Sequence, residues 1–508
     1  MRGIRRGRQW HEKAVWALWV LFLMSIPFTS FPHFPKTAFS DAIVRPLALY
    51  PLGLLLAIQL VPFLAKRGRL PFGSLPLIAF LLVCVLELGL VALDPSPALR
   101  GNTPLSRGAR GLSSLVIGLG VYLTTVSVLR DRSCILATLR WLYAVYAAVL
   151  AWSAVQISWI LTGWPTNDQL NAIQAIFSVR DLRHGRVSGF AYEPSWLADQ
   201  LVLLFLPFVL GGLIAGQPVV GRGKSGRFLE VVLLALGIVT LLFTYSRGGL
   251  ASWLVSAGLV VVGLGLRHRG RIVAWLLGRD HSAKPRGIRP VPVFLRVAGT
   301  AAAVLAGAAA GVWTLARSQY FALVWTRLPR LLTGAGIIRY LASIGGDIRM
   351  ALAEASWRVF QDYPLLGVGL GQSGFHVLDR IPAWAGETSA LTAELLSPWS
   401  MEYPNPKNLW LRLLAETGLV GSLLYVVFLI LMLANSLRLA TTRDRLAKAV
   451  GLAGLMAWIA WLLEGLTLDS FALPTIWLVF GLLSQSAVVL DHAEERTGPG
   501  NPVSQEVS

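Results

Sequence analysis

Two short polar turns in a largely apolar chain each place an arginine where a phosphate group would bind. Arg186 lies between Gly185 and Gly189, and Arg247 directly precedes Gly248 in a tight turn. Planar, permanently charged guanidinium groups hold phosphate oxygens bidentately and stabilise charge on a departing diphosphate. Between apolar runs, such a group needs an anion or a polar partner. Lipid phosphate is the alternative anion at both positions, and for Arg186 taken alone it is the favoured one.

A carboxylate follows the first of these turns. Glu193 directly precedes Pro194 and an apolar run, which is typical of a helix start with a negative charge at the positive end of the dipole. Glu193 is therefore a candidate catalytic residue next to Arg186. Capping of the following helix is an alternative of equal weight.

The residues from 317 to 405 form the one large polar segment, and it combines charges with aromatic residues. It carries seven arginines and seven carboxylates, but roughly its first third, residues 317–349, has five arginines against one aspartate. That third can face a phosphate, and Arg327 and Arg330 represent it as candidate substrate-binding residues. Trp399 and Tyr403 can stack on sugar rings, although interfacial aromatics are the commoner use of such residues.

A helix is predicted within this segment from Ile348 to Asp362. Asp347 caps its start, and Tyr363-Pro364 ends it. Arg358 is a further candidate for substrate binding. Glu354 lies four residues earlier, however, and this order favours an ion pair on the helix surface.

The predicted outer segments offer no metal or cofactor site. They contain no Asp-x-Asp or comparable acidic pair and no nucleophile, base and acid in a catalytic order. The glycine-rich stretch from residue 364 to 371 lacks the strand, turn and helix of a nucleotide fingerprint. We therefore expect a reaction that depends on arginine, without metal or cofactor.

The elements that must position these residues are membrane-spanning helices. Hydrophobic residues make up 55% of the chain and charged residues 14%, which excludes a soluble globular protein of this length. The apolar runs, each near the ~20 residues that a span requires, lie at about 14–31, 44–65, 71–93, 112–129, 138–162, 194–216, 228–244, 249–266, 297–316, 418–437, 447–466 and 474–491. The sequence predicts an all-α polytopic membrane protein with about twelve spans.

The charges indicate its orientation. If the chain starts inside, 27 of the 45 Lys and Arg residues fall on the cytoplasmic side and 18 on the other. Both termini are then cytoplasmic, and segment 317–405 is external. The positive-inside rule and anionic headgroups account for most of the net charge of +19, so no nucleic acid partner is implied.

The predicted organisation has four parts. They are nine spans in 1–316, the large external loop 317–405, an amphipathic helix leading into three further spans in 406–491, and a cytoplasmic tail in 492–508.

In these polar segments the chain resembles the superfamily of O-antigen ligases and Wzy-type polysaccharide repeat-unit polymerases of bacterial inner membranes. The matching motifs are Arg186-x-x-Gly189 with Glu193-Pro194-Ser195, Ser246-Arg247-Gly248, Asp362-Tyr363-Pro364-Leu365-Leu366-Gly367-Val368-Gly369, and Asn408-Leu409-Trp410-Leu411-Arg412 continuing to Gly421. Their order and their placement on one side make the combination fairly specific over about residues 180–440.

The resemblance implies a GT-C-like, metal-independent glycosyltransferase acting at the periplasmic face. A glycan on undecaprenyl diphosphate would be the donor, and Arg186 and Arg247 would bind its diphosphate. Asn408 opens the last motif and is a candidate substrate contact. Ligases usually carry His directly before that Asn, and here the position is Lys407. A lysine ammonium is better suited to holding phosphate than to removing a proton, which favours a polymerase over a ligase.

Several alternatives remain at this stage. The acceptor is either another lipid-linked repeat unit, as in a polymerase, or a lipid A core, as in a ligase. A protein O-oligosaccharyltransferase would share the fold and chemistry. A non-enzymatic flippase would be expected to show repeated halves and charged residues within its spans. The partners expected are the lipid-linked donor and acceptor, membrane lipids and other polysaccharide assembly proteins.

The orientation leads to a direct prediction. Reporter fusions after Pro285 should indicate a cytoplasmic position, and fusions after Ala385 a periplasmic one. Pro285 lies in a basic loop, and the predicted span 297–316 separates this loop from the large segment that contains Ala385. Paired alkaline phosphatase and β-galactosidase fusions measure this. Equal reporter behaviour at the two sites would contradict the predicted orientation.

Overall fold

The protein is all-α in the part of the chain that the structure describes. This computed structural model describes residues 2–33, 45–182, 185–221, 223–267, 322, 326, 346–388, 395–397 and 399–497. Within these ranges the chain forms helices, and the only β pairing consists of two isolated bridges, Ser30–Arg45 and Leu99–Asn102. The predicted all-α fold class is confirmed.

The described helices include eight that are long and apolar enough to cross a membrane. They are α4 (Ser74–Leu93), α5 (Pro104–Val128), α6 (Arg132–Thr162), the α8–α9 unit (Pro194–Ala215), α10 (Gly223–Thr244), α11 (Arg247–Arg267), α20 (Leu409–Thr441) and α21 (Arg445–Glu464). Shorter apolar helices cover Leu49–Ala65 and Pro474–Leu490, and α1 (Arg2–Ser25) overlaps the first predicted run. The polytopic membrane character is thus confirmed. The predicted run 297–316 lies outside the described residues.

Helix α21 is at the centre of the bundle. It packs against α9 (Leu206–Ala215), α11, α20 and α22 (Pro474–Thr497). Its Trp461 is fully enclosed and donates through Nε1 to the Tyr425 hydroxyl of α20 at 3.1 Å. Large buried aromatic residues with satisfied polar atoms fix how these helices pack. The loop that follows α21 is thereby held beside the ends of α8 and α11.

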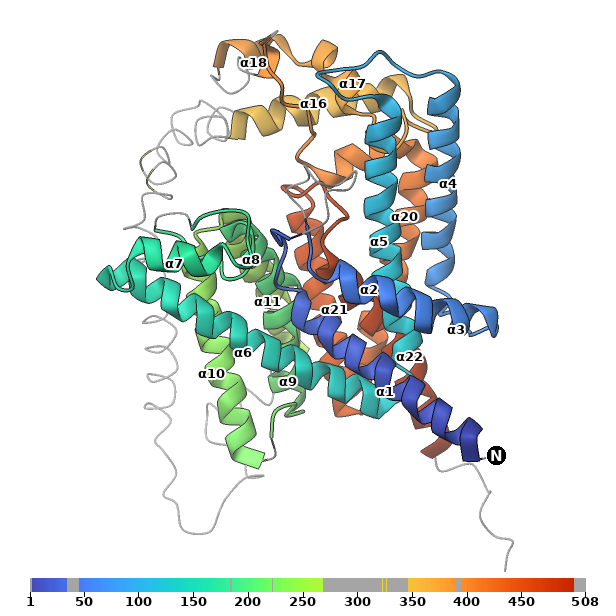
Figure 1. Ribbon diagram of the computed structural model, residues 1–508, viewed down its shortest axis with the longest axis vertical. Coiled ribbons are helices and arrows are strands. Elements are labelled where there is room, and N and C mark those ends of the chain that lie inside the picture. Colours follow the sequence, from blue (N-terminus) through green and yellow to red (C-terminus); the bar gives the residue numbers. More distant parts are fainter. Residues whose placement is uncertain are drawn as a thin grey trace, which may run out of the picture.

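One end of the bundle carries a small helical cap. It consists of α16 (Asp347–Asp362), α17 (Gly374–Val377), η5 (Leu378–Arg380) and α18 (Ala383–Thr388), which lie together above α5 and α20 in Figure 1. Apolar residues of α16 pack against Val377, Leu395 and Ala415 in a core of their own. The predicted helix therefore exists and ends at Asp362 as expected. The prediction that Asp347 is the N-cap residue of α16 was wrong. Asp347 is the first residue of the helix, and the N-cap residue is Gly346, which makes no side-chain hydrogen bond.

The cap is anchored where α20 breaks. Gly418 has φ 55°, outside the helical range, which frees backbone groups in an otherwise continuous helix. The stretch from Pro364 to Gly369 satisfies them: Leu419 N donates to Pro364 O at 2.8 Å, and Gly369 N donates to Glu416 O at 2.8 Å. Non-helical backbone is tolerated at such a position when protein covers it. Two of the motifs recognised in the sequence therefore bind each other.

Replacing Gly418 with alanine should destabilise the protein. A Cβ there would lie 2.3 Å from Leu365 O, and the positive φ disfavours any side chain. Backbone strain of this kind costs about 1–3 kcal/mol, and the clash adds to it. Thermal unfolding of the detergent-solubilised protein should show a lower midpoint. The control is Gly89→Ala in α4, where nothing lies within 4 Å, and equal midpoints for the two variants would contradict this account.

Candidate functional site

A polar cleft of about 740 Å³ lies where several loop ends meet. It is formed by the starts of α8 (Pro194–Gln200), α11 and α16 and by the loops before α20 and after α21. Four residues predicted from the sequence line it together, namely Arg186, Glu193, Arg247 and Lys407. These residues are far apart in the chain, so their convergence is a property of the fold.

The segment that carries Arg186 is bonded to the turn between α10 and α11, which carries Arg247. Arg186 Nε donates to Thr244 O at 2.8 Å, and Val187 N donates to Phe243 O at 3.0 Å. The segment that carries Arg186 is therefore fastened to the end of α10. The turn reverses through residue 245 and α11 begins at Arg247, so this guanidinium lies at a helix N-terminus. The partial positive charge of that terminus adds to the attraction for an anion.

Glu193 occupies the cap position of α8 without capping it through its side chain. Its carboxylate instead forms an ion pair with Arg180 and accepts a hydrogen bond from Ser195 Oγ at 3.2 Å. The Arg180 guanidinium also lies over the Tyr192 ring, 4.8 Å from its centroid. Glu193 is thus the cap residue that the alternative expected, although its carboxylate makes no cap hydrogen bond and forms part of a charged wall of the cleft.

Lys407 lies in a tight turn just before α20. Its φ of 53° places it in the left-handed region, and its backbone N donates to Asp469 Oδ2 at 3.1 Å. Asn408 follows as the cap of α20, and its Oδ1 accepts from Leu411 N at 3.1 Å. Asn408 therefore fixes the helix start, while its neighbours Asn405 and Lys407 line the cleft.

Arg349 adds a fourth cation to the cleft. Its Nη1 donates to Thr467 O at 2.9 Å and to Lys407 O at 3.4 Å, so the start of α16 is tied to the two loops. Burial lowers the pKa of Arg349, the Asp469 carboxylate opposes that change, and the Arg247 charge adds to it. Burial likewise raises the pKa of Asp469, against the influence of Arg412. A bound anion would relieve the repulsion among the cations.

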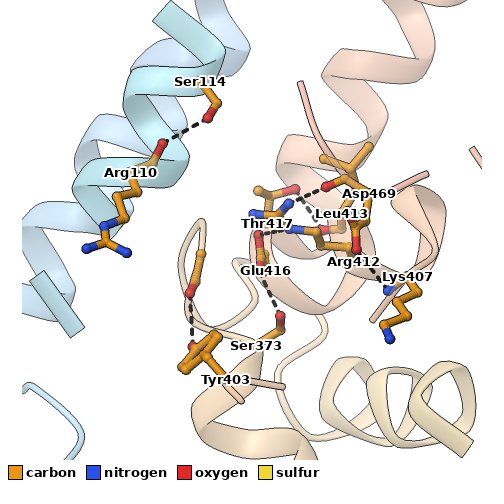
Figure 2. Close-up of polar contacts among 11 residues, drawn as sticks. Arg110, Ser114, Ser373, Tyr403, Lys407, Arg412, Leu413, Glu416, Thr417 and Asp469 are labelled. Carbon is orange, nitrogen blue, oxygen red and sulfur yellow. Dashed lines mark hydrogen bonds and ion pairs between the residues drawn. The ribbon is translucent and has the colours of Figure 1, made fainter. Parts of the chain in front are cut away.

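A buried polar chain joins this cleft to the cap, as Figure 2 shows. Arg412 donates to Asp469 O and, through Nε, to Glu416 Oε2 at 2.9 Å. Ser373 Oγ donates to Glu416 Oε1 at 2.7 Å. Buried networks in which every member is satisfied make a structure rigid. The glycine-rich stretch before Ser373 thus supports the loop that carries Asp469 and, through it, Lys407.

Other predicted binding residues lie away from the cleft. Arg358 pairs with Glu354 at 2.5 Å, as the alternative interpretation expected, and Trp399 is 90% exposed. Tyr403 lies beneath the Arg107 guanidinium, 3.8 Å from ring centroid to Cζ, and donates to Gly371 O at 3.2 Å. None of the three lines the cleft. Arg327 and Arg330 lie outside the described residues.

Two acidic residues in the cleft were missed by the sequence analysis. Asp199 in α8 and Glu464 at the end of α21 line it, and their side chains are 5% and 3% exposed. The two carboxyl groups are hydrogen-bonded to each other. The sequence does contain a signal that identifies them. Each is an acidic residue inside an apolar run, and such a residue in a membrane span is a functional candidate by default. Glu87 in α4 is another buried acidic residue inside an apolar run, but it lies outside this cleft.

These features define a polytopic membrane protein with a cationic cleft among its loop ends. Residues 232–426 match the family described as O-antigen ligase. The match confirms the predicted resemblance to the O-antigen ligase and Wzy superfamily, and it supports a membrane function of O-antigen ligase or polymerase type. Arg247, Arg349 and Lys407 lie within the matched residues, and Arg186 precedes them. A comparison with curated proteins gave no match.

Proposed function

We propose that the protein polymerises oligosaccharide repeat units linked to undecaprenyl diphosphate, at the periplasmic face of the bacterial inner membrane. The observation that supports this most strongly is the convergence of Arg186, Arg247, Arg349 and Lys407 on one cleft. Four cations are suited to a ligand with several negative charges, such as a diphosphate. The family match supports a lipid-linked glycan as the substrate.

The proposed role of the cations is to stabilise the leaving group. As the bond between the sugar and the diphosphate breaks, negative charge grows on the phosphate oxygens. Arg186 and Arg247 donate from groups already fixed by the fold, since Arg186 is bonded to the end of α10 and Arg247 begins α11. Prearranged donors need little reorganisation during the reaction. Arg349 and Lys407 hold the same diphosphate from the opposite loops.

Metal independence is part of this proposal. The residues that the structure describes contain no group of three or more His, Cys, Asp and Glu side chains arranged to hold a metal ion. The arginines are assigned the charge stabilisation that a divalent cation provides in other phosphate chemistry. Activity in excess chelator is therefore the expected result.

Lys407 is the reason for proposing a polymerase. In this proposal the ammonium of Lys407 holds phosphate, whereas the resembling ligases carry His at that position. Deletion of the gene tests the assignment, with extraction of the lipid carriers and analysis of their glycans by mass spectrometry. The expected result is single repeat units on the carrier. Full-length polymer on the carrier would instead indicate a ligase, and loss of glycan from proteins alone would indicate a protein-directed transferase.

A further inference from the structure

The acid pair formed by Asp199 and Glu464 is unusual for a membrane-spanning bundle. Both side chains are at least nine-tenths buried, yet both line the cationic cleft. Two carboxyl groups can hydrogen-bond to each other only when one of them holds a proton. The pair therefore holds at least one proton, and with a single proton it leaves one carboxylate that can accept another.

The geometry distinguishes the two members. Glu464 Oε1 is buried and has no hydrogen-bond partner among the described residues, whereas the other contacts of this side chain are to Asp199 and Ser252. A buried carboxylate oxygen without a donor is costly unless a ligand supplies one. A Cβ added at Gly248 would lie 3.6 Å from Glu464 Oε2, so the acid lies next to the turn that carries Arg247. The carboxyl group of Glu464 is thus close to the position assigned to the diphosphate.

We infer that Glu464 is the general base of the transfer and that Asp199 positions it. This inference rests on the proposed function. The acceptor hydroxyl donates to Glu464 Oε1 and loses its proton to that carboxylate as its oxygen bonds to the anomeric carbon. The bond from that carbon to the phosphate oxygen breaks, and its electron pair leaves with the diphosphate held by the arginines. The substrate class is an alcohol of a sugar, which must be deprotonated in order to attack.

The chain needs such a group because Lys407 cannot serve as a base while it is charged. Among the carboxylates that line the cleft, Glu193 is paired with Arg180 and Asp469 accepts from Lys407 N. Both carboxylates are therefore already engaged by donors within the protein. Glu464 alone combines a cleft position with an unpaired oxygen among the described residues.

The test compares two nucleophiles in purified protein given a lipid-diphosphate oligosaccharide. A sugar hydroxyl needs a base, whereas azide attacks without losing a proton. Glu464→Gln should reduce transfer to the sugar acceptor by about 100-fold or more, while glycosyl azide still forms at a rate near that of the unmodified protein. Asp199→Asn should give a smaller loss of sugar transfer and the same azide rate. The matched control, Glu87→Gln, replaces another buried glutamate and should leave both reactions unchanged.

Two results would overturn the inference. One is a Glu464→Gln variant that retains sugar transfer, and the other is a variant that binds donor normally but forms neither product. If Glu464→Gln does not fold, the Asp199→Asn variant provides the test. An equal loss of azide transfer and sugar transfer in that variant would contradict a role of the acid pair in proton removal. Failure of the proposed function gives a different result from failure of this inference. If the proposed function is wrong, the unmodified protein releases no undecaprenyl diphosphate with either nucleophile.

Discussion

Replacement of Arg247 with alanine should reduce glycan synthesis by about 100-fold to 1,000-fold, the usual effect of removing one donor that stabilises a developing negative charge. Arg247 begins α11, and its guanidinium lies in the cleft with Arg186 and Arg349. Arg247→Lys should also be impaired, because an ammonium cannot replace two parallel hydrogen bonds. The measurement is the release of undecaprenyl diphosphate by purified variants at saturating donor.

A matched control excludes a general effect of lost charge. Arg110 is exposed on α5, and its guanidinium points away from the polar chain in Figure 2. Arg110→Ala should therefore keep nearly full activity. Normal activity of Arg247→Ala at an unchanged expression level would contradict the role of the arginine in leaving-group stabilisation.

The second large effect is expected at Lys407. If its ammonium holds phosphate, Lys407→Ala should lose most activity and Lys407→Arg should keep much of it. Lys407→His should not improve activity, although it restores the residue type of the resembling ligases. The positive φ of Lys407 is common to all three variants, so the backbone strain is matched among them. Lys66→Ala, at an exposed lysine far from the cleft, is the control.

The kinetic pattern distinguishes the possible roles of Lys407. A phosphate contact present in both the ground state and the transition state should raise KM more than it lowers kcat when removed. A Lys407→His variant that is faster than the unmodified protein, or that gains activity with a lipid A core acceptor, would contradict the assignment to a polymerase.

The helices follow from the sequence because a membrane span must satisfy its backbone hydrogen bonds within itself. Every predicted run except 297–316 overlaps a helix or series of helices in the described residues. Local signals also predicted the end of α16 at Asp362 and the ion pair between Glu354 and Arg358. In each case the determining interactions lie within a few residues along the chain.

The cleft depends on contacts between distant segments, which a single sequence does not encode in any local pattern. Arg349 belongs to the arginine-rich part of the large polar segment, but its position in the cleft depends on bonds to Thr467 and Lys407. Asp199 and Glu464 meet because α21 packs against α9, which continues the helical unit that α8 begins. The break at Gly418 likewise requires the stretch from Pro364 to Gly369, which only the fold brings to it.

The central claim is that this cleft transfers a glycan from one lipid diphosphate to another without metal. The most direct measurement uses the purified full chain in excess chelator with one synthetic undecaprenyl-diphosphate-linked repeat unit as both donor and acceptor. Mass spectrometry should detect two or more joined units on a single carrier, with one undecaprenyl diphosphate released for each bond formed. Unchanged substrate in this mixture, with product appearing only after a divalent cation or a lipid A core is added, would contradict the account.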